Sequence, residues 1–374
     1  MFRSRSLVMT LALSGYLLPQ SASHAHLPSR LAIYYGYPSL INGSQGDVEK
    51  AASVLSQYDV VVLGDGIEFP DRQAGRYPEG DPDEHQKARQ IIAAVERRSP
   101  GTRFYGYVCL GEILLPGQKE LVLSQPEMEQ RILLWKNLGV KGIFLDEAGY
   151  DYAAITRKRQ NMAVSLIHKQ GLSAFMNAYF LDHLFSSEDN LPFAKGKGKN
   201  PEHLPPLLDR RDLFLLESFQ VKNGAYEDAA AGRARLAQAL KYRRRFGSAI
   251  FATTTTREPE PFDSAKFNYA WWTAQLYGID GMGWGEPEFS ALSNSLPDRR
   301  CRLDDATQGV LQQASAVSSD SVRSWAKEGS FLVVLDSETH SVHRVPSAGP
   351  VASTNIEALL RSSQAQPVSC GGRL

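Results

Sequence analysis

The sequence has few of the residues that mark a disulfide scaffold or a metal protein. It contains only three cysteines, Cys109, Cys301 and Cys370, with no Cys-x-x-Cys pair. The eight histidines show no metal-ligand spacing apart from His340 and His343, which fall in a predicted hairpin. We expect no metal and no cofactor, an inert buried thiol at Cys109, and a disulfide between Cys301 and Cys370 only if export permits it.

Two motifs that identify other enzyme classes are also missing. No Gly-x-Gly-x-x-Gly turn follows an early strand, which disfavours an open dinucleotide-binding sheet. Ser218 lacks a Gly-x-Ser-x-Gly elbow, so serine hydrolysis has little support. Charge is balanced, with 41 Lys and Arg against 41 Asp and Glu, so no overall field favours nucleic acid as a partner.

Long apolar runs are absent after the N-terminal segment, so we expect no membrane span. Residues 1–25 are typical of a secretory signal peptide. Arg3 and Arg5 precede an apolar core at 7–18, and Ser23-His24-Ala25 has the pattern of a cleavage site. The sequence thus predicts export to the periplasm or the exterior. It contains no signal that indicates a particular protein partner.

Short apolar segments alternate with helical patterns from residue 31 to residue 285. The predicted strands are 31–36, 59–64, 103–110, 142–149, 173–179, 213–219, 249–256 and 278–285. Eight strand-and-helix units in about 260 residues are typical of a (β/α)8 TIM barrel. We therefore expect an α/β fold with a barrel at 27–290. A small β-rich appendage follows at 291–374, in which 331–335 and 341–345 form a hairpin.

Acidic and polar residues gather where these strands end. Barrel enzymes carry their active groups at the carboxyl ends of the strands, and the residues found there are Asp65, Glu68, Glu112, Asp146, Glu147, Asn177, Tyr179, Glu217, Gln220 and Glu286. Side-chain alternation turns Phe144 with Asp146, and Leu215 with Glu217, toward the barrel interior. Because strands four and six are next-but-one neighbours, the carboxylates fall within the roughly 5–9.5 Å that glycosidases use.

A structural role competes with the functional one at most of these positions. Asp146 also suits a helix cap or a buried salt bridge, and alternation points Glu147 at the helices unless the strand has already ended. Asp65, Glu68, Glu112 and Glu286 suit solvated loop acids equally well. Asn177 and Tyr179 suit backbone contacts, Trp272 and Trp284 suit the aromatic core, and Lys195–Lys199 suits a mobile solvated loop.

Three segments resemble the spherulin-4-like and polygalactosaminidase-type glycoside hydrolases. They are 139–148, which contains Asp146-Glu147, then Asn177, and then Leu215-Leu-Glu-Ser218; the opening 32–38, with Tyr35, also fits. The resemblance spans about residues 31 to 287. It implies a barrel that cleaves α-1,4-linked galactosamine or N-acetylgalactosamine polymers, with the acid pair on Asp146 and Glu217 and the adjacent acid on Glu147.

We therefore expect a secreted glycoside hydrolase with Asp146, Glu217 and Glu147 as catalytic residues and a polysaccharide as substrate. The expected substrate-binding residues are Tyr35, Asp65, Glu112, Asn177, Tyr179, Gln220, Trp284 and Glu286. The alternative is a non-catalytic carbohydrate-binding or envelope protein on the same barrel. A hydrolase using a metal held by the acids is disfavoured, because no histidine accompanies them.

Overall fold

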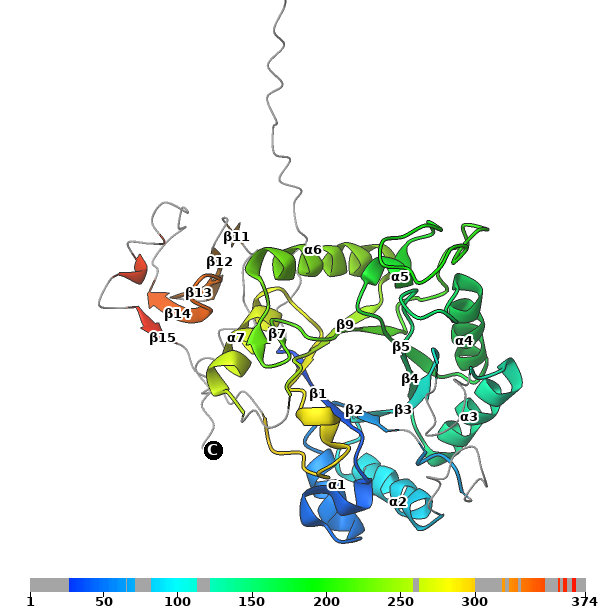
Figure 1. The fold of residues 1–374 in the computed structure, drawn as a ribbon. Helices are drawn as coiled ribbons and strands as arrows, with labels where there is room; N and C mark the ends of the chain where they lie inside the picture. The colour runs from blue at the N-terminus through cyan, green and yellow to red at the C-terminus, as the bar shows by residue number, and fades with distance from the viewer. Residues whose placement is uncertain are drawn as a thin grey trace, which may run out of the picture.

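Eight parallel strands form the centre of the molecule, which is described here from a computed structural model (Figure 1). The described residues are 27–64, 66–70, 82–112, 122–257, 262–299, 318–319, 323–328, 331–346, 356, 359–361 and 365–367. The predicted signal peptide, Asp65, Cys301 and Cys370 lie outside them, so the disulfide stays a prediction.

The strands close into a barrel in the order β1-β10-β9-β6-β5-β4-β3-β2. Their bounds are Ser29–Tyr34 (β1), Val60–Leu63 (β2), Arg103–Cys109 (β3), Gly142–Asp146 (β4), Ser173–Asn177 (β5), Leu213–Leu216 (β6), Ala249–Thr253 (β9) and Gly281–Gly283 (β10). All eight neighbouring pairs are parallel. The predicted (β/α)8 barrel is thereby confirmed, and every predicted strand is present.

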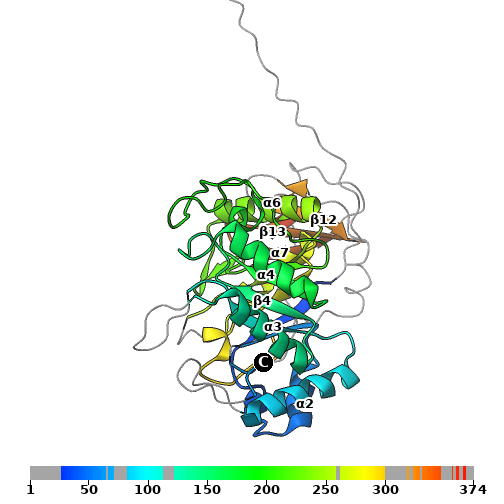
Figure 2. The same cartoon turned by 90° about the vertical axis from the view of Figure 1, so that its right-hand side faces the viewer.

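Helices follow seven of the strands and surround the barrel (Figures 1 and 2). They are α1 (Val48–Leu55), α2 (Pro82–Arg98), α3 (Gln125–Leu138), α4 (Arg157–Lys169), α5 (Leu181–Phe185), α6 (Ala229–Phe246) and α7 (Ser264–Leu276), with 3-10 turns η1 (Pro38–Gly43) and η2 (Pro287–Ser290). Their starts follow from local chemistry, because Asp47 caps α1 and Ser124 forms a capping box with Glu127 on α3. None of these helices, over the described residues, is long and apolar enough to cross a membrane.

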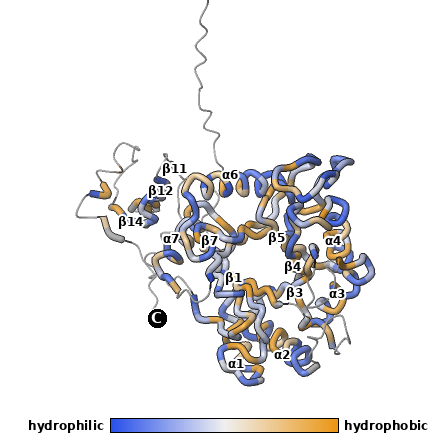
Figure 3. Tube along the Cα trace, viewed as in Figure 1, coloured by the Kyte–Doolittle hydropathy of each residue, from blue (hydrophilic) through white to orange (hydrophobic). Residues whose placement is uncertain are grey.

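The strand side chains divide into an inner and an outer apolar layer. Phe144 packs inside the barrel with residues such as Phe175 and Leu215, whereas Ile143 and Leu145 join the layer beneath the helices. Figure 3 shows orange stretches along the barrel strands and blue stretches on the peripheral helices and loops. The alternation inferred from the sequence is therefore present, and it directs the residues at the strand ends.

The C-terminal region contains a five-stranded antiparallel sheet in the order β11-β12-β13-β14-β15. Its strands are Ser318–Ser319, Arg323–Glu328, Phe331–Asp336 (β13), Ser341–Pro346 (β14) and Gln366–Pro367. The predicted hairpin corresponds to β13 and β14, which pair in register.

This sheet packs beside α6 and α7 (Figure 1). Val333, Leu335 and Val342 share the outer apolar layer of the barrel. His340 stacks on Tyr226, whose strand β8 (Ala225–Tyr226) pairs with β7 (Val221–Lys222) in a hairpin inserted after β6. The appendage is therefore in direct apolar contact with the barrel.

Candidate active site

The adjacent strands β4, β5 and β6 bring three predicted residues together at the carboxyl-end mouth of the barrel. Asp146 and Asn177 are the last residues of β4 and β5, and Glu217 directly follows β6. Asn177 is buried, and the two acids are half-buried. Each side chain continues the inward-facing row of its strand, because Phe144, Phe175 and Leu215 line the interior.

Asn177 joins the two acids through a single amide nitrogen. Its Nδ2 donates to Asp146 Oδ1 at 2.8 Å and to Glu217 Oε2 at 2.8 Å. Since both oxygens lie 2.8 Å from the same nitrogen, they are at most 5.6 Å apart. Two carboxylates this close face a shared space, which suits attack on one substrate bond from two sides.

The acids differ in the number of donors that they accept. Asp146 Oδ1 also accepts from the Glu147 backbone N–H at 2.9 Å, and its Oδ2 accepts from Tyr107 Oη at 3.0 Å. Within the part of the chain that the structure describes, the Glu217 carboxylate accepts a hydrogen bond from Asn177 alone. Donors to a carboxylate favour its ionised form, so the hydrogen bonds by themselves favour the anion more at Asp146 than at Glu217.

Burial raises the pKa of both acids above the ordinary carboxyl range. At Asp146, burial outweighs the opposing hydrogen bonds from Asn177, Glu147 and Tyr107. At Glu217, burial and the negative charge of Asp146 raise the pKa, while the hydrogen bond from Asn177 and the cations Arg235 and Lys222 lower it. Carboxyl groups with raised pKa values at a strand-end mouth are suited to proton transfer near neutral pH.

The backbone takes a left-handed conformation directly after each acid. Glu147 has φ 52° and Ser218 has φ 58°, values that residues other than glycine seldom adopt. Such strain costs about 1–3 kcal/mol per residue and occurs preferentially at functional sites. The sharp turns end both strands while leaving Asp146 and Glu217 aimed inward.

Glu147 lies on the β3 side of Asp146, away from Asn177. Its Oε2 accepts from the Glu112 backbone N–H at 3.1 Å and from Cys109 Sγ at 3.4 Å. Gly111 makes this position accessible, because a Cβ there would lie 2.4 Å from Glu147 Oε2. Burial raises the pKa of Glu147, and it also raises that of the Cys109 thiol, which stays protonated as a donor. The strand has ended by Glu147, so alternation does not send it to the helices.

Tyr179 lies between two cations beside Glu217. Lys222 Nζ donates to Tyr179 Oη at 3.0 Å and sits 4.3 Å from its ring centroid. The Arg235 guanidinium lies 5.1 Å from the same ring, and its Nη2 donates to the backbone carbonyl of Glu217 at 2.9 Å. Arg235 therefore fixes the backbone that carries Glu217.

Two more predicted residues lie close to the acids. Tyr35 packs edge-on against Tyr107, the donor to Asp146, with ring centroids 5.4 Å apart. Glu112 Oε1 accepts from the Ala154 backbone N–H at 3.2 Å, and Lys195 Nζ lies 4.0 Å from Glu112 Oε2. Both residues belong to the mouth, since Tyr35 packs on the donor to Asp146 and the Glu112 backbone donates to Glu147.

Three predicted residues have the contacts of packing residues instead. Trp284 is buried between Phe262 and Phe267 in the outer layer, because β10 alternation turns it away from the interior. Gln220 is buried next to α6, and Glu286 is ion-paired with Arg299 at 2.8 Å. The structure does not bring these three to the paired acids.

Two expectations about charged residues need correction. Glu68 is fully buried and ion-paired with Arg131 of α3, so it is not a solvated loop acid. Lys199 is also buried, and its Nζ donates to the carbonyls of Tyr152 and Ala153. The Lys195–Lys199 segment is therefore anchored at both of its ends, since Lys195 N donates to the Tyr150 carbonyl.

Sequence reasoning missed two tyrosines of the mouth. Tyr107 has the same parity as Tyr105 on β3, and its pairing with Phe144 would have indicated the interior. Tyr152, in the loop after β4, has its pKa raised by burial and then by the nearby charges of Glu147 and Asp146. Only the tertiary fold of that loop brings Tyr152 to the acids.

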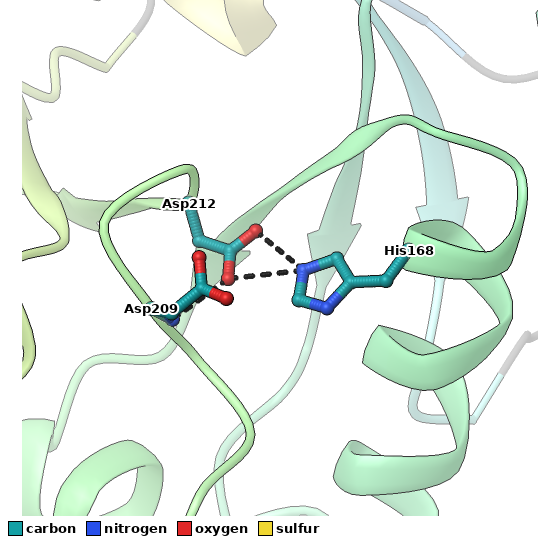
Figure 4. Close-up of side chains that lie close together, drawn as sticks. All are labelled: His168, Asp209 and Asp212. Carbon is teal, nitrogen blue, oxygen red and sulfur yellow. Dashed lines mark hydrogen bonds and ion pairs between the residues drawn. The ribbon is translucent and has the colours of Figure 1, made fainter.

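A second polar cluster lies at the opposite, amino end of the strands (Figure 4). His168 Nε2 contacts both oxygens of Asp212 at 2.9 and 3.1 Å. The buried Asp212 also accepts from the backbone N–H groups of Ala174 and Asp209, each at 2.9 Å. With His168 and Asp209 it forms the one group among the described residues with metal-ligand spacing. Its hydrogen bonds tie α4, β5 and the start of β6 together, which is a structural role typical of this end of a barrel.

The fold and the mouth define a (β/α)8 barrel with a carboxylate pair bridged by an asparagine. No family model matches the chain, and no curated protein sequence matches it. Solved structures that it resembles include the glycoside hydrolase domain of PelA from Pseudomonas aeruginosa, at 16% identity and TM-score 0.38, covering 72% of this chain and 100% of that one.

Two further barrel structures cover most of this chain. A cyclic α-maltosyl-(1→6)-maltose hydrolase from Arthrobacter globiformis is 9% identical with TM-score 0.48, covering 91% of this chain and 97% of its own. An α-amylase from Malbranchea cinnamomea is 10% identical with TM-score 0.48, and the match covers 92% of this chain and 93% of the amylase chain. Glycoside hydrolases are thus among the similar structures, but at these TM-scores the likeness carries no conclusion about activity.

Proposed function

We propose that this protein is a glycoside hydrolase in which Asp146 and Glu217 cleave the bond. The observation that carries the proposal is the Asn177 amide bridging the two acids at 2.8 Å on each side. The two bonded oxygens are at most 5.6 Å apart, which is compatible with the close carboxyl pair, roughly 5–5.5 Å apart, of retaining enzymes.

The hydrogen bonds support one assignment of the two roles. Asp146 accepts from Asn177, Glu147 and Tyr107, which stabilise the carboxylate that attacks the anomeric carbon. Burial raises the pKa of both acids, but Glu217 accepts fewer hydrogen bonds, so we assign to it the proton that passes to the leaving oxygen. In the second step Glu217, now ionised, takes a proton from water, and the water oxygen displaces Asp146 from the sugar.

The proposed substrate is an α-1,4-linked galactosamine or N-acetylgalactosamine exopolysaccharide, met after export. The sequence resemblance of 139–148, Asn177 and 215–218 supports this choice. Charge adds a physical reason, because Glu147 and Asp151 lie near the pair and would attract a protonated amino sugar. Lys222 and Arg235 offset part of this attraction on the Glu217 side.

Reducing-end release from purified, partly deacetylated α-1,4-galactosaminogalactan tests the proposal. We expect the wild-type protein to release reducing ends, and to release few from amylose under the same conditions. Retention of the α configuration in the first product, read by NMR, would support the double displacement. Binding without release would instead favour the non-catalytic carbohydrate-binding alternative.

Tyr107→Phe should move the acidic limb of the pH profile upward. Removing a donor to Asp146 raises the pKa of this carboxyl group further. As pH falls, Asp146 is therefore protonated earlier in the variant, and activity is lost at a higher pH than in the wild type. A hydrogen bond to a charged group contributes about 1.5–3 kcal/mol, and we expect a shift of about one pH unit in kcat/KM.

Tyr105→Phe is the matched control for this variant. Tyr105 faces the same interior two residues earlier and contacts Ser173, not Asp146. Its pH profile should overlay that of the wild type. An unchanged acidic limb in Tyr107→Phe would remove Asp146 as the group that controls it.

A further inference from the structure

An aromatic pair on the rim of the barrel has no part in the bond cleavage described above. Phe193 is 71% exposed, an unusual exposure for a large apolar side chain. Its ring lies parallel to that of Phe180, with an interplanar angle of 7° and centroids 4.4 Å apart. One face of Phe193 is therefore covered, and the residue is largely open to solvent.

The surrounding loop holds Phe193 firmly in this position. The buried His183 contacts the carbonyl of Pro192, the residue before Phe193, through Nε2 at 2.8 Å. Its Nδ1 accepts from the Tyr150 backbone N–H at 3.0 Å, and Lys195 N donates back to the Tyr150 carbonyl at 2.7 Å. The chain after Phe193 is thus bonded directly to the β4–α4 loop, and the chain before it is bonded to that loop through His183 of α5.

The backbone of Phe193 is also strained. Its φ is 64°, in the left-handed region where a bulky residue is a genuine outlier. A surface phenylalanine that gains little from burial and pays for a left-handed backbone is poorly explained by stability alone. Strain of this kind points to a functional constraint.

The pair lies at the same end of the barrel as the acids. Phe180 follows Asn177 by three residues, which places their Cα atoms within about 11 Å of each other. Tyr179, between them, packs edge-on against Phe180 with ring centroids 5.2 Å apart. Beyond Phe193 the chain reaches the end of β3, where Lys195 approaches Glu112. The stacked rings therefore sit on the rim between β5 and the acidic mouth.

We propose that Phe193 and Phe180 form an aromatic platform that binds a pyranose ring of the same glycan chain, at a subsite away from the cleaved bond. The inference rests on the proposed function. A flat aromatic face offers a π surface and dispersion contacts to the C–H face of a sugar, and it attracts a protonated amine above the ring. Phe180 supports Phe193 from below, and His183 keeps the platform in place.

The test compares Phe193→Ala, Phe193→Gly and Phe193→Trp in the full-length protein. The alanine variant removes the face, and the glycine variant does so while relieving the left-handed strain, so a folding defect can be separated from a binding defect. Tryptophan preserves the face. Leu133→Ala on the outer side of α3, at 39% exposure, is the control for loss of an exposed apolar side chain.

Two measurements are made on each variant. The first is turnover of galactosaminogalactan polymer and of short galactosamine oligomers. The second is equilibrium binding of the same polymer. It is measured on proteins that combine each substitution with Glu217→Gln, so that the polymer is not cleaved during the measurement. We expect Phe193→Ala and Phe193→Gly to raise KM for polymer by roughly tenfold, since aromatic contacts contribute about 1 kcal/mol or somewhat more. The rise should be smaller for short oligomers, and Phe193→Trp and Leu133→Ala should resemble the parent.

The outcomes separate the platform from the proposed function. If all variants cleave the polymer with the same KM as the wild type, the aromatic platform is overturned and the proposed hydrolase activity stands. Binding without cleavage, weakened by loss of Phe193, would overturn the hydrolase and keep the platform. Equal loss on polymer and oligomers, or a fall confined to kcat, would show a local effect on the acids and remove the platform. Absence of both cleavage and binding would overturn both.

Discussion

Replacing Glu217 with glutamine is expected to lower kcat on galactosaminogalactan by about 10²–10⁴-fold, the usual contribution of a general acid. The amide cannot donate a proton to the leaving oxygen, although it retains the size and the contact with Asn177. Asp146→Asn should be at least as damaging, because it removes the nucleophile of the double displacement. Reducing-end assays at matched protein concentration measure the loss of kcat. With an activated substrate, the Glu217 variant should also show a burst as the covalent intermediate accumulates.

Stability provides the control for these two variants. Burial raises the folded pKa of both acids, so their ionised forms are disfavoured in the folded state relative to the unfolded chain. This costs stability in full above the raised folded pKa; the cost shrinks as pH falls from that value toward the ordinary carboxyl pKa, and it is absent below the ordinary pKa. The amide variants should therefore unfold at pH 7 no more easily than the wild type. A large loss of stability would instead indicate the structural role considered for Asp146, and near-normal turnover would remove either residue from the catalytic pair.

Glu68→Gln is expected to destabilise the folded protein by about 3–5 kcal/mol, the usual result of leaving one charge of a buried pair uncompensated. Glu68 is fully buried and Arg131 is 2% exposed, with Arg131 Nε donating to Glu68 Oε1 at 2.6 Å. The Arg131 guanidinium also lies over the Phe69 ring, so the pair holds the loop after β2 against α3. Urea unfolding gives the difference in free energy.

A double variant distinguishes the charge from the packing. Glu68→Leu with Arg131→Met removes both charges and retains apolar volume, so its loss should be clearly smaller than that of Glu68→Gln. Arg98→Met, which breaks an exposed ion pair with Glu49, should change stability by less than about 1 kcal/mol. Equal losses in the single and double Glu68 variants would show that packing, not the uncompensated charge, dominates.

For the C-terminal appendage and for export, the structure bears on only part of what the sequence predicted. The predicted β13–β14 hairpin is present, and it packs on α7 through residues such as Val342. The signal peptide at 1–25 stays a prediction, as does the domain boundary at 290. Hydrogen bonds to the barrel continue past that boundary, since the Leu296 carbonyl accepts from Asn42 and the Pro297 carbonyl from Tyr58.

The sequence alone predicted the eight strands, the inward direction of Asp146 and Glu217, and the place of Asn177 at a strand end. This was possible because buried parallel strands need continuous apolar segments, and their side chains alternate with a fixed period. The acids follow directly after the apolar segments, which places them at the end of the barrel where every parallel strand finishes. No long-range information is needed for either inference, since both depend on neighbours in the chain.

The tertiary structure decided what lies beyond the last residue of each strand. Glu147 turns toward Cys109 because its backbone is left-handed, and Glu68 is buried because α3 supplies Arg131 as its partner. Tyr107 and Tyr152 reach the acids through the closure of the barrel and the path of one loop. Loop conformation and charge pairing depend on contacts between segments far apart in sequence, and local periodicity carries no information about them.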